Sequence, residues 1–391
     1  MRGRGKTWIA IVAISGIAAP ALRAQAASPL SSGSPSRAQT LLRSDLEQAT
    51  QALKRGDNVS AEKGFRRALE IDPNSLQALN DLGIVLARMG RPTEAIPFYQ
   101  KALRVRPDPA TKRNLAIAYF KSERYANAWS TLRPMAVERS ADFQVLELAG
   151  LSLFALDRYT EAAEYLERAN QLQPSDLETL DMLGKAYLHI KNYKALTRVF
   201  ARIMQVNPNS ASAHILMGTA YDDMQQRSDA IKEYQLAEQA DPNFTGVHSG
   251  LGYLYFRQGE AELAEKEFRA ELQRFPNDPV SNCYLGEILL NQTQPANAKP
   301  YFEAALKTNP RYIEALLGLG KTELAMNDPK AAIPPLRRAV QIEPNNFQAH
   351  YVLGTTLRQV GQNAEAAREQ KLSLEIQEKQ RAAAIRKNEN K

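Results

Sequence analysis

The chain has 391 residues, a net charge of +7 and a hydrophobic fraction of 44%, which is ordinary for a folded protein. The first 26 residues hold four basic residues and no acid, so only +3 belongs to the rest of the chain. This near balance provides no basic stripe for phosphate groups and argues against a nucleic-acid-binding function.

Residues 1–26 have the three-part pattern of a secretory signal peptide. Three basic residues lie within the first six positions, residues 8–19 form an apolar run, and Ala24-Gln25-Ala26 provides the small residues that a signal peptidase requires. The apolar run is shorter than the roughly 20 residues that span a bilayer. We therefore expect cleavage after Ala26 and a periplasmic or secreted protein, with an uncleaved membrane anchor as the alternative.

Residues 27–41 are rich in Ser and Pro and lack apolar periodicity, which predicts a flexible linker. The chain contains a single cysteine, Cys283, so no intrachain disulfide can form and an exported fold must be stable through packing alone. As a lone thiol in an exported protein, Cys283 is either a small packing residue or a reactive site.

A 34-residue period begins at Leu42. Position 8 of this frame is Gly in eight of ten copies, position 20 is Ala in nine, and position 32 is Pro in eight. The second copy is one residue shorter than the others. The predicted repeats are 42–75, 76–108, 109–142, 143–176, 177–210, 211–244, 245–278, 279–312, 313–346 and 347–380.

Each recurrent position has a physical reason that points to a pair of helices. Small residues at positions 8 and 20 allow two helices to cross closely, and large apolar residues fill positions 7 and 24. Pro at position 32 ends the second helix. A following Asn or Ser, such as Ser75 or Ser210, can cap the next helix. The fold class is therefore all-α.

This pattern resembles the tetratricopeptide repeat (TPR) family over residues 42–380, with Tyr187, Tyr221 and Tyr255 at the eleventh position. The resemblance implies a right-handed α-solenoid superhelix in which the first helix of each pair lines a concave groove. Repeats of this kind must stack to bury their apolar faces. Residues 381–391 are expected to form a charged helical tail. The sequence departs from the family pattern at Glu271, which occupies a position usually held by Ala.

The sequence provides no catalytic, metal-binding or cofactor-binding signature. His214, His248 and His350 share position 4, which packs against a neighbouring helix, so we interpret them as packing residues. Asp222 and Asp223 are adjacent on one helix and point about 100° apart, which does not suit a pair of catalytic carboxylates. The repeats leave no segment for a catalytic domain, so we do not expect an enzyme.

The resemblance also implies a groove lined by positions 2, 5, 9, 12 and 13. The Lys/Asn/Arg clamp that some relatives use for chaperone C-termini is missing, since the corresponding positions include Glu47, Asp81 and Asn114. The candidate protein-binding residues are Phe120, Phe154, Asp181, Lys185, Asp222, Asp223, Tyr253, Phe256, Glu287, Asn291 and Lys321.

Scattered aromatics and charges of both signs suit an extended peptide or a partner protein's helix. The first hypothesis is therefore a non-catalytic protein-interaction scaffold in the periplasm or cell envelope. The alternative is a carbohydrate-handling module of an exopolysaccharide export or envelope assembly system, in which Tyr253 and Phe256 would stack on sugars.

Overall fold

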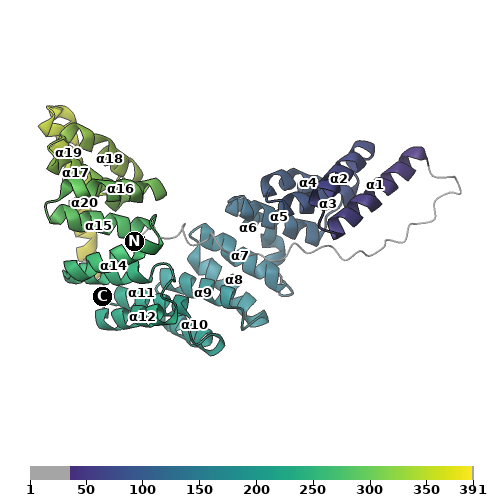
Figure 1. The fold of residues 1–391 in the computed structure, drawn as a ribbon, viewed down its shortest axis with the longest axis horizontal. Helices are drawn as coiled ribbons and strands as arrows, with labels where there is room; N and C mark the ends of the chain where they lie inside the picture. Colours follow the sequence, from purple (N-terminus) through teal and green to yellow (C-terminus); the bar gives the residue numbers. More distant parts are fainter. Residues whose placement is uncertain (1–35, 390–391) are drawn as a thin grey trace. The chain divides into compact units, whose positions relative to one another are not determined.

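A computed structural model describes residues 36–389, and all regular secondary structure in that range is α-helical. The predicted signal peptide and most of the predicted linker lie outside the described residues. The helices follow one another in pairs joined by short turns (Figure 1). They are α1 (Arg37–Lys54), α2 (Asn58–Ile71), α3 (Leu76–Arg88), α4 (Pro92–Val105), α5 (Pro109–Lys121), α6 (Tyr125–Ala136), α7 (Phe143–Ala155), α8 (Tyr159–Leu172), α9 (Leu177–His189), α10 (Tyr193–Val206), α11 (Ala211–Asp223), α12 (Arg227–Ala240), α13 (Val247–Gln258), α14 (Ala261–Arg274), α15 (Pro279–Asn291), α16 (Pro295–Thr308), α17 (Ile313–Ala325), α18 (Pro329–Ile342), α19 (Phe347–Gln359) and α20 (Asn363–Glu389).

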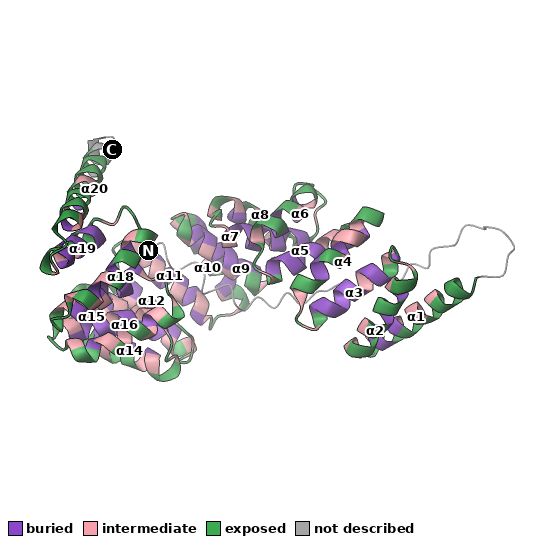
Figure 2. Ribbon diagram, turned by 90° about the horizontal axis from the view of Figure 1, so that it is seen from above, coloured by how far each residue is buried: buried purple, intermediate pink, exposed green. Residues whose placement is uncertain are grey.

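The chain divides into two compact units, unit 1 (Met1–Val206) and unit 2 (Asn207–Lys391). Within each unit every helix packs against the next in sequence, and the first helices of consecutive repeats also approach one another, as α1 and α3 or α15 and α17 do. The first helices therefore form the inner layer of each unit. Figure 2 shows buried residues running through first helices such as α3, α5 and α7, because these helices are covered on both sides.

Two predicted boundaries shift. The helix α1 begins at Arg37, so residues 37–41 are helical and do not belong to a flexible linker. The reason is a capping box, in which the Ser36 hydroxyl accepts from the Gln39 amide and the Gln39 side chain accepts from the Ser36 amide. At the other end, α20 continues through residue 380, so the last repeat and the predicted tail share one helix.

The close helix crossing that positions 8 and 20 predict is present. A Cβ atom added to Gly150 or Gly218 would lie 3.3 Å from the backbone oxygen of Ala162 or Ala230, respectively. The predicted caps are present too, because the hydroxyls of Ser75 and Ser210 accept hydrogen bonds at the starts of α3 and α11. Small residues therefore let the two helices of a repeat approach backbone to backbone.

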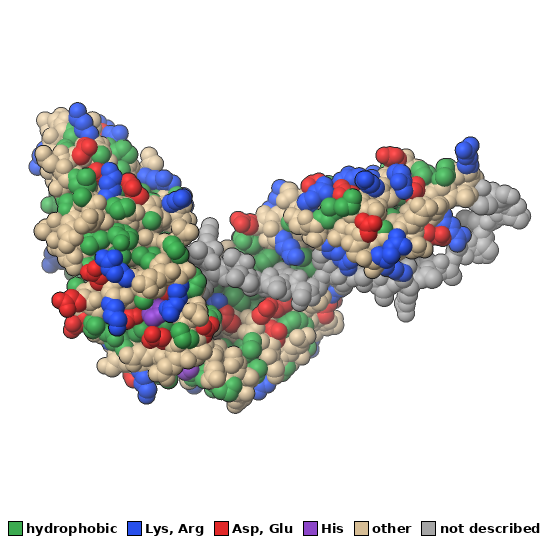
Figure 3. All heavy atoms as spheres, viewed as in Figure 1, with side chains coloured by type: hydrophobic (Ala, Val, Ile, Leu, Met, Phe, Trp, Pro, Cys, Tyr) green, Lys and Arg blue, Asp and Glu red, His purple; other side chains and the backbone are tan. Residues whose placement is uncertain are grey.

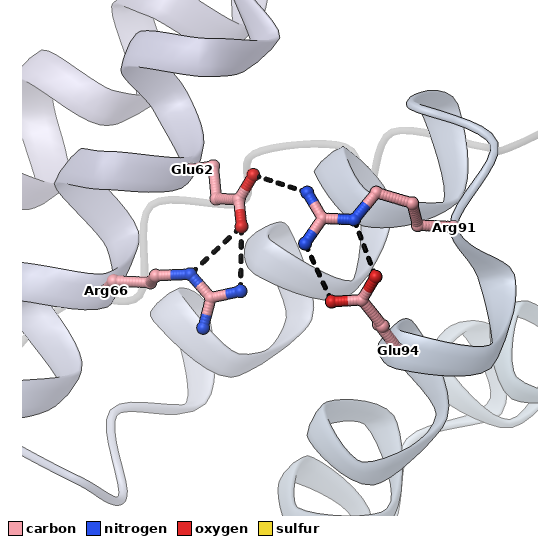
Figure 4. Close-up of polar contacts among 4 residues, drawn as sticks. All are labelled: Glu62, Arg66, Arg91 and Glu94. Carbon is pink, nitrogen blue, oxygen red and sulfur yellow. Dashed lines mark hydrogen bonds and ion pairs between the residues drawn. The ribbon is translucent and has the colours of Figure 1, made fainter.

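An ion-pair network joins the second helices of the first two repeats (Figure 4). The Glu62 carboxylate on α2 accepts from Arg66 at 2.7 Å and from Arg91 at 2.8 Å. Arg91 also contacts Glu94 at 2.6 Å. Burial favours a higher pKa for Glu62, but the two arginines outweigh it and hold that pKa below its usual value. Arg91 thus ties the start of α4 to α2 on the outer side of unit 1.

The turn between the two helices places position 15 of every repeat in the left-handed region of backbone space. Four of these ten residues are glycines and six are not, among them Thr293 with a φ of 60°. A β-branched residue is strained there, at a cost of about 1–2 kcal/mol, because its side chain crowds the following carbonyl. The turn thus keeps a conformation that the local sequence opposes.

Replacing Thr293 with Gly is expected to stabilise the protein. We expect a gain of about 0.5–1 kcal/mol in the free energy of unfolding, since relief of strain exceeds the extra entropy of the unfolded chain. Urea unfolding of both proteins measures the difference. Gly90→Ala is the matched reverse change, because φ is +74° there and a Cβ would meet nothing within 4 Å, so its expected loss of about 1 kcal/mol is conformational. Equal stability of Thr293→Gly and the parent protein would contradict the strain.

Candidate protein-binding surface

The strongest candidate surface lies on the inner layer of unit 2, where α11, α13 and α15 are joined by a chain of side-chain contacts. The ring of Tyr284 lies 5.3 Å from that of Tyr253 and 5.2 Å from that of Phe256, between centroids. The guanidinium of Arg257 lies 5.6 Å from the centroid of Tyr253. We call Tyr253, Phe256, Arg257 and Tyr284 the aromatic cluster; all four remain partly or fully exposed.

Asp222 is buried, although the sequence predicted that it would line the groove. Its carboxylate is buried and accepts from Nη1 of Arg257 at 2.7 and 2.9 Å. It therefore does not present a charge to a ligand directly, but it holds Arg257 beside the aromatic rings. The neighbouring Asp223 is partly exposed. Arg257 was not among the predicted groove residues, although it is the only basic residue at position 12 or 13 of the repeats that start at 211 and 245.

The inner layer continues from the aromatic cluster to α17 through Glu287 and Lys321. Burial raises the pKa of Glu287, the charge of Lys321 opposes that shift, and Glu314 reinforces it. Cys283 lies close by but is only 1% exposed, and burial raises the pKa of its thiol well above the usual value. Such a thiol is a poor nucleophile, which fits the packing interpretation of Cys283. Asn291 ends α15 and is exposed.

In unit 1, the two predicted groove aromatics are corrected by the structure. Phe120 and Phe154 are 7% and 4% exposed, because each packs edge-on against the tyrosine that begins the following helix, Tyr125 or Tyr159. Their rings therefore belong to the core and cannot receive a ligand. The recurrence of Tyr at that position was the sequence signal for this packing. His189 stacks on Tyr159 with 4.0 Å between ring centroids.

The remaining predicted residues of unit 1 form a local pair on one helix. Lys185 contacts Asp181 at 2.5 Å on α9, four residues apart, and both side chains are partly buried. A shallow depression lies further along the same layer, between α1 and α3. Its lining residues are Gln39, Leu42, Arg43, Leu46, Glu47, Thr50 and Gln77. This depression has no aromatic anchor.

The three histidines at position 4 are packing residues, and each of them contacts a glutamate of its own repeat. Nδ1 of His214, His248 and His350 lies 2.5–2.8 Å from a glutamate nineteen residues later, on the second helix of the same repeat. Within residues 36–389 no cluster of three or more His, Cys, Asp or Glu side chains could hold a metal ion. No helix in the same range has both the length and the apolar character needed to cross a membrane.

Charges of both signs are interspersed on the surface in view in Figure 3, with no continuous basic or acidic field. Two of the predicted groove charges are also paired locally, because Asp222 contacts Arg257 and Lys185 contacts Asp181. A surface of this kind selects a ligand through a few fixed side chains rather than through net charge.

Two family models, both described as tetratricopeptide repeat, match the chain. One covers residues 38–108, and the other covers residues 113–176, 215–279, 285–347 and 317–380. No curated protein matches the chain.

Solved structures of three proteins are similar. Yeast Tom70 is 15% identical over 89% of this chain and 96% of its own, with a TM-score of 0.43. MamA is 22% identical over 42% of this chain and 96% of its own, with a TM-score of 0.38. YrrB, described as a TPR protein with an unusual peptide-binding site, is 20% identical over 48% of this chain and 97% of its own, with a TM-score of 0.39.

Proposed function

The chain belongs to the tetratricopeptide repeat family, whose members are generally non-catalytic scaffolds that bind proteins or peptides, and we propose that it is an exported scaffold whose unit 2 binds a segment of a partner protein. The observation that carries the proposal is the aromatic cluster on the inner layer. It combines accessible rings with a charge that a buried carboxylate fixes in place. Aromatic and arginine side chains dominate the energy of protein interfaces.

The ring geometry favours a peptide over a sugar. The planes of Tyr253 and Tyr284 are inclined by 57°, and those of Phe256 and Tyr284 by 55°. Inclined rings form a notch that accepts an apolar side chain, whereas a sugar ring stacks on one flat face. Phe268 does lie parallel to Tyr284, but Phe268 is fully buried. The ligand that we propose is an extended segment or a helix with an apolar or aromatic anchor. It would lie beside Glu287 on α15 and Lys321 on α17.

A test of this proposal compares peptide and glycan ligands with one matched pair of variants. A peptide selected from a random library on the purified protein is titrated against Tyr253→Ala and against Tyr301→Ala, a partly buried tyrosine on the second helix α16. We expect Tyr253→Ala to weaken binding at least tenfold, about 1.4 kcal/mol, and Tyr301→Ala to leave it unchanged.

Two results would count against the peptide site. Equal losses in the two variants would show that the aromatic cluster is not the contact surface. Glycan-array binding that depends on Tyr253, in the absence of any selected peptide, would favour the carbohydrate alternative instead.

Export is the second part of the proposal, and it is supported by the pattern of residues 1–26 alone. A cleaved signal would place the scaffold in the periplasm or outside the cell. Fractionation of the producing cells and N-terminal sequencing of the mature protein test it. A mature protein that begins after Ala26 is expected, and an intact N-terminus in the cytoplasmic fraction would contradict export.

A further inference from the structure

Within the described residues, α20 is the last helix of the array, and part of its apolar surface is uncovered. In the two preceding repeats, position 28 of the second helix is a hydrophobic residue, Leu306 or Val340, that is partly buried against the cluster that contains Leu353. Leu374 has the same position in α20 but is 60% exposed. Tyr351 on α19 is also 60% exposed, whereas its equivalent one repeat earlier, a leucine, is buried. Leu374 and Tyr351 therefore expose hydrophobic surface that a packing partner can cover.

At the other end of the array, the first helix α1 differs from α19 in the side chains that it exposes. In α19, frame positions 3, 7 and 10 are Ala349, Leu353 and Thr356, and all three are buried. The same positions in α1 are Ser44, Gln48 and Gln51, and all three are exposed. A polar surface of this kind does not complement the apolar end. Head-to-tail stacking of successive copies is therefore disfavoured, and a contact between two like ends is the alternative.

The exposed side of α20 carries a seam with the spacing of a coiled coil. The residues of this seam follow one another at intervals of four, three and four, so they lie along one face of the helix: Leu374, Glu378, Arg381 and Ile385. All four are exposed, and Ile385 is 50% exposed. Figure 2 shows this part of α20 as an exposed helix that extends beyond α19. The face that packs on α19 is a different one, on which the Ser373 hydroxyl donates to the Phe347 carbonyl.

We propose that this seam is the contact surface for a second copy of the chain, through an antiparallel pair of α20 helices. Two copies aligned around the midpoint between residues 379 and 380 place Leu374 opposite Ile385 of the partner copy. The same alignment places Glu378 opposite Arg381, twice by symmetry, between the two apolar layers. Every seam residue then meets either an apolar or an oppositely charged residue.

Charge selects the antiparallel direction. In a parallel pair Glu378 would face a second Glu378, and Arg381 would face a second Arg381, so like charges would repel at two layers. The polar pair in the middle of an apolar seam thus fixes direction and register, which is the best attested role of such residues in paired helices. With four seam residues from each helix, the contact is smaller than a standard stable interface. We expect a reversible dimer with a Kd on the order of 10 µM.

Sedimentation equilibrium of the full chain tests the proposal through charge reversal at exposed positions. Glu378→Arg and Arg381→Glu, each alone, are expected to weaken dimerisation at least tenfold, because each places like charges opposite one another. An equimolar mixture of the two single variants is expected to form a heterodimer, and the double variant to recover the homodimer. Unchanged circular dichroism and melting temperature confirm that the reversals leave the fold intact.

Three results would overturn the proposal. A wild-type chain that stays monomeric up to about 200 µM, well above the expected Kd, has no such contact. A dimer that both single reversals leave unchanged uses another surface. Failure of the two single variants to pair when they are mixed would show that Glu378 and Arg381 do not face each other, and would leave the end of the array to a different partner.

Discussion

Gly318→Val is expected to lower the free energy of unfolding by about 2–3 kcal/mol. A Cβ atom at Gly318 would lie 2.2 Å from Cε1 of Phe302, and the Phe302 ring is almost completely buried. The ring cannot move away, because a Cβ atom at Gly286, on its other side, would lie 3.0 Å from it. Phe302 is thus enclosed between two glycines of consecutive repeats. Chemical denaturation of the variant and the parent protein measures the loss.

A second substitution that the chain itself suggests serves as the control. One repeat later, Leu336 and Val352 occupy the positions of Phe302 and Gly318, and both belong to the same packed cluster. The double variant Phe302→Leu with Gly318→Val reproduces that pair and is expected to recover most of the lost stability. If the double variant is less stable than Gly318→Val alone, crowding of the ring is not the cause of the loss.

Glu271→Ala is expected to cost about 2–3 kcal/mol, even though Ala is the usual residue at that position of the repeat. The helix α13 has no side-chain cap, because its N-cap is Gly246 in the left-handed conformation. The Glu271 carboxylate on α14 supplies the missing acceptor, receiving the amide of Gly246 at 2.8 Å and that of Ser249 at 3.3 Å. The change to Ala leaves both amides without this partner, in a place where Glu271 is 1% exposed. Thermal and urea unfolding measure the effect.

Glu271→Gln separates the hydrogen bonds from the charge. Gln keeps a carbonyl acceptor, so we expect it to lose less stability than Ala. Burial raises the pKa of Glu271, and the amides of Gly246 and Ser249 only partly oppose this. Since the folded state holds the proton more tightly, this group adds stability below its ordinary pKa and loses it as the pH rises through the folded pKa.

The stability difference between the parent protein and Glu271→Gln should therefore shift in favour of the parent as the pH falls. The Gln side chain does not titrate, and the other titrating groups are common to both proteins, so the pH dependence of this difference reports on the Glu271 carboxyl group. A difference that is constant between about pH 4 and pH 8 would contradict a raised pKa for this group.

The repeat pattern predicted the helix pairs, their order and their crossing points, because these depend on contacts within about 34 residues of chain. Position 8 had to be small and position 32 had to end a helix, whatever the rest of the fold does. Glu271 shows where such reasoning ends. It departs from the pattern in the sequence, and only the missing side-chain cap of α13, 25 residues away, gives the departure a reason.

The candidate surface was less predictable than the fold. The frame placed the candidate residues on first helices, but it could not separate exposed rings from buried ones. Phe120 and Phe154 share position 12 with Phe256, and a neighbouring tyrosine covers them, while Phe256 faces Tyr284 and stays partly exposed. Exposure depends on which side chain of another helix lies above the ring, and a single frame position carries no such information.

Helix periodicity, small crossing residues and helix ends are local properties, so they predict an all-α array of helix pairs without any knowledge of the fold. The tertiary structure, by contrast, makes Asp222 a buried support for Arg257 and places Tyr284 in the aromatic cluster. It also decided that Leu374 has no following repeat within the described residues. These features depend on contacts between repeats. Side chains with the same position in the period differ there, because each has a different neighbour.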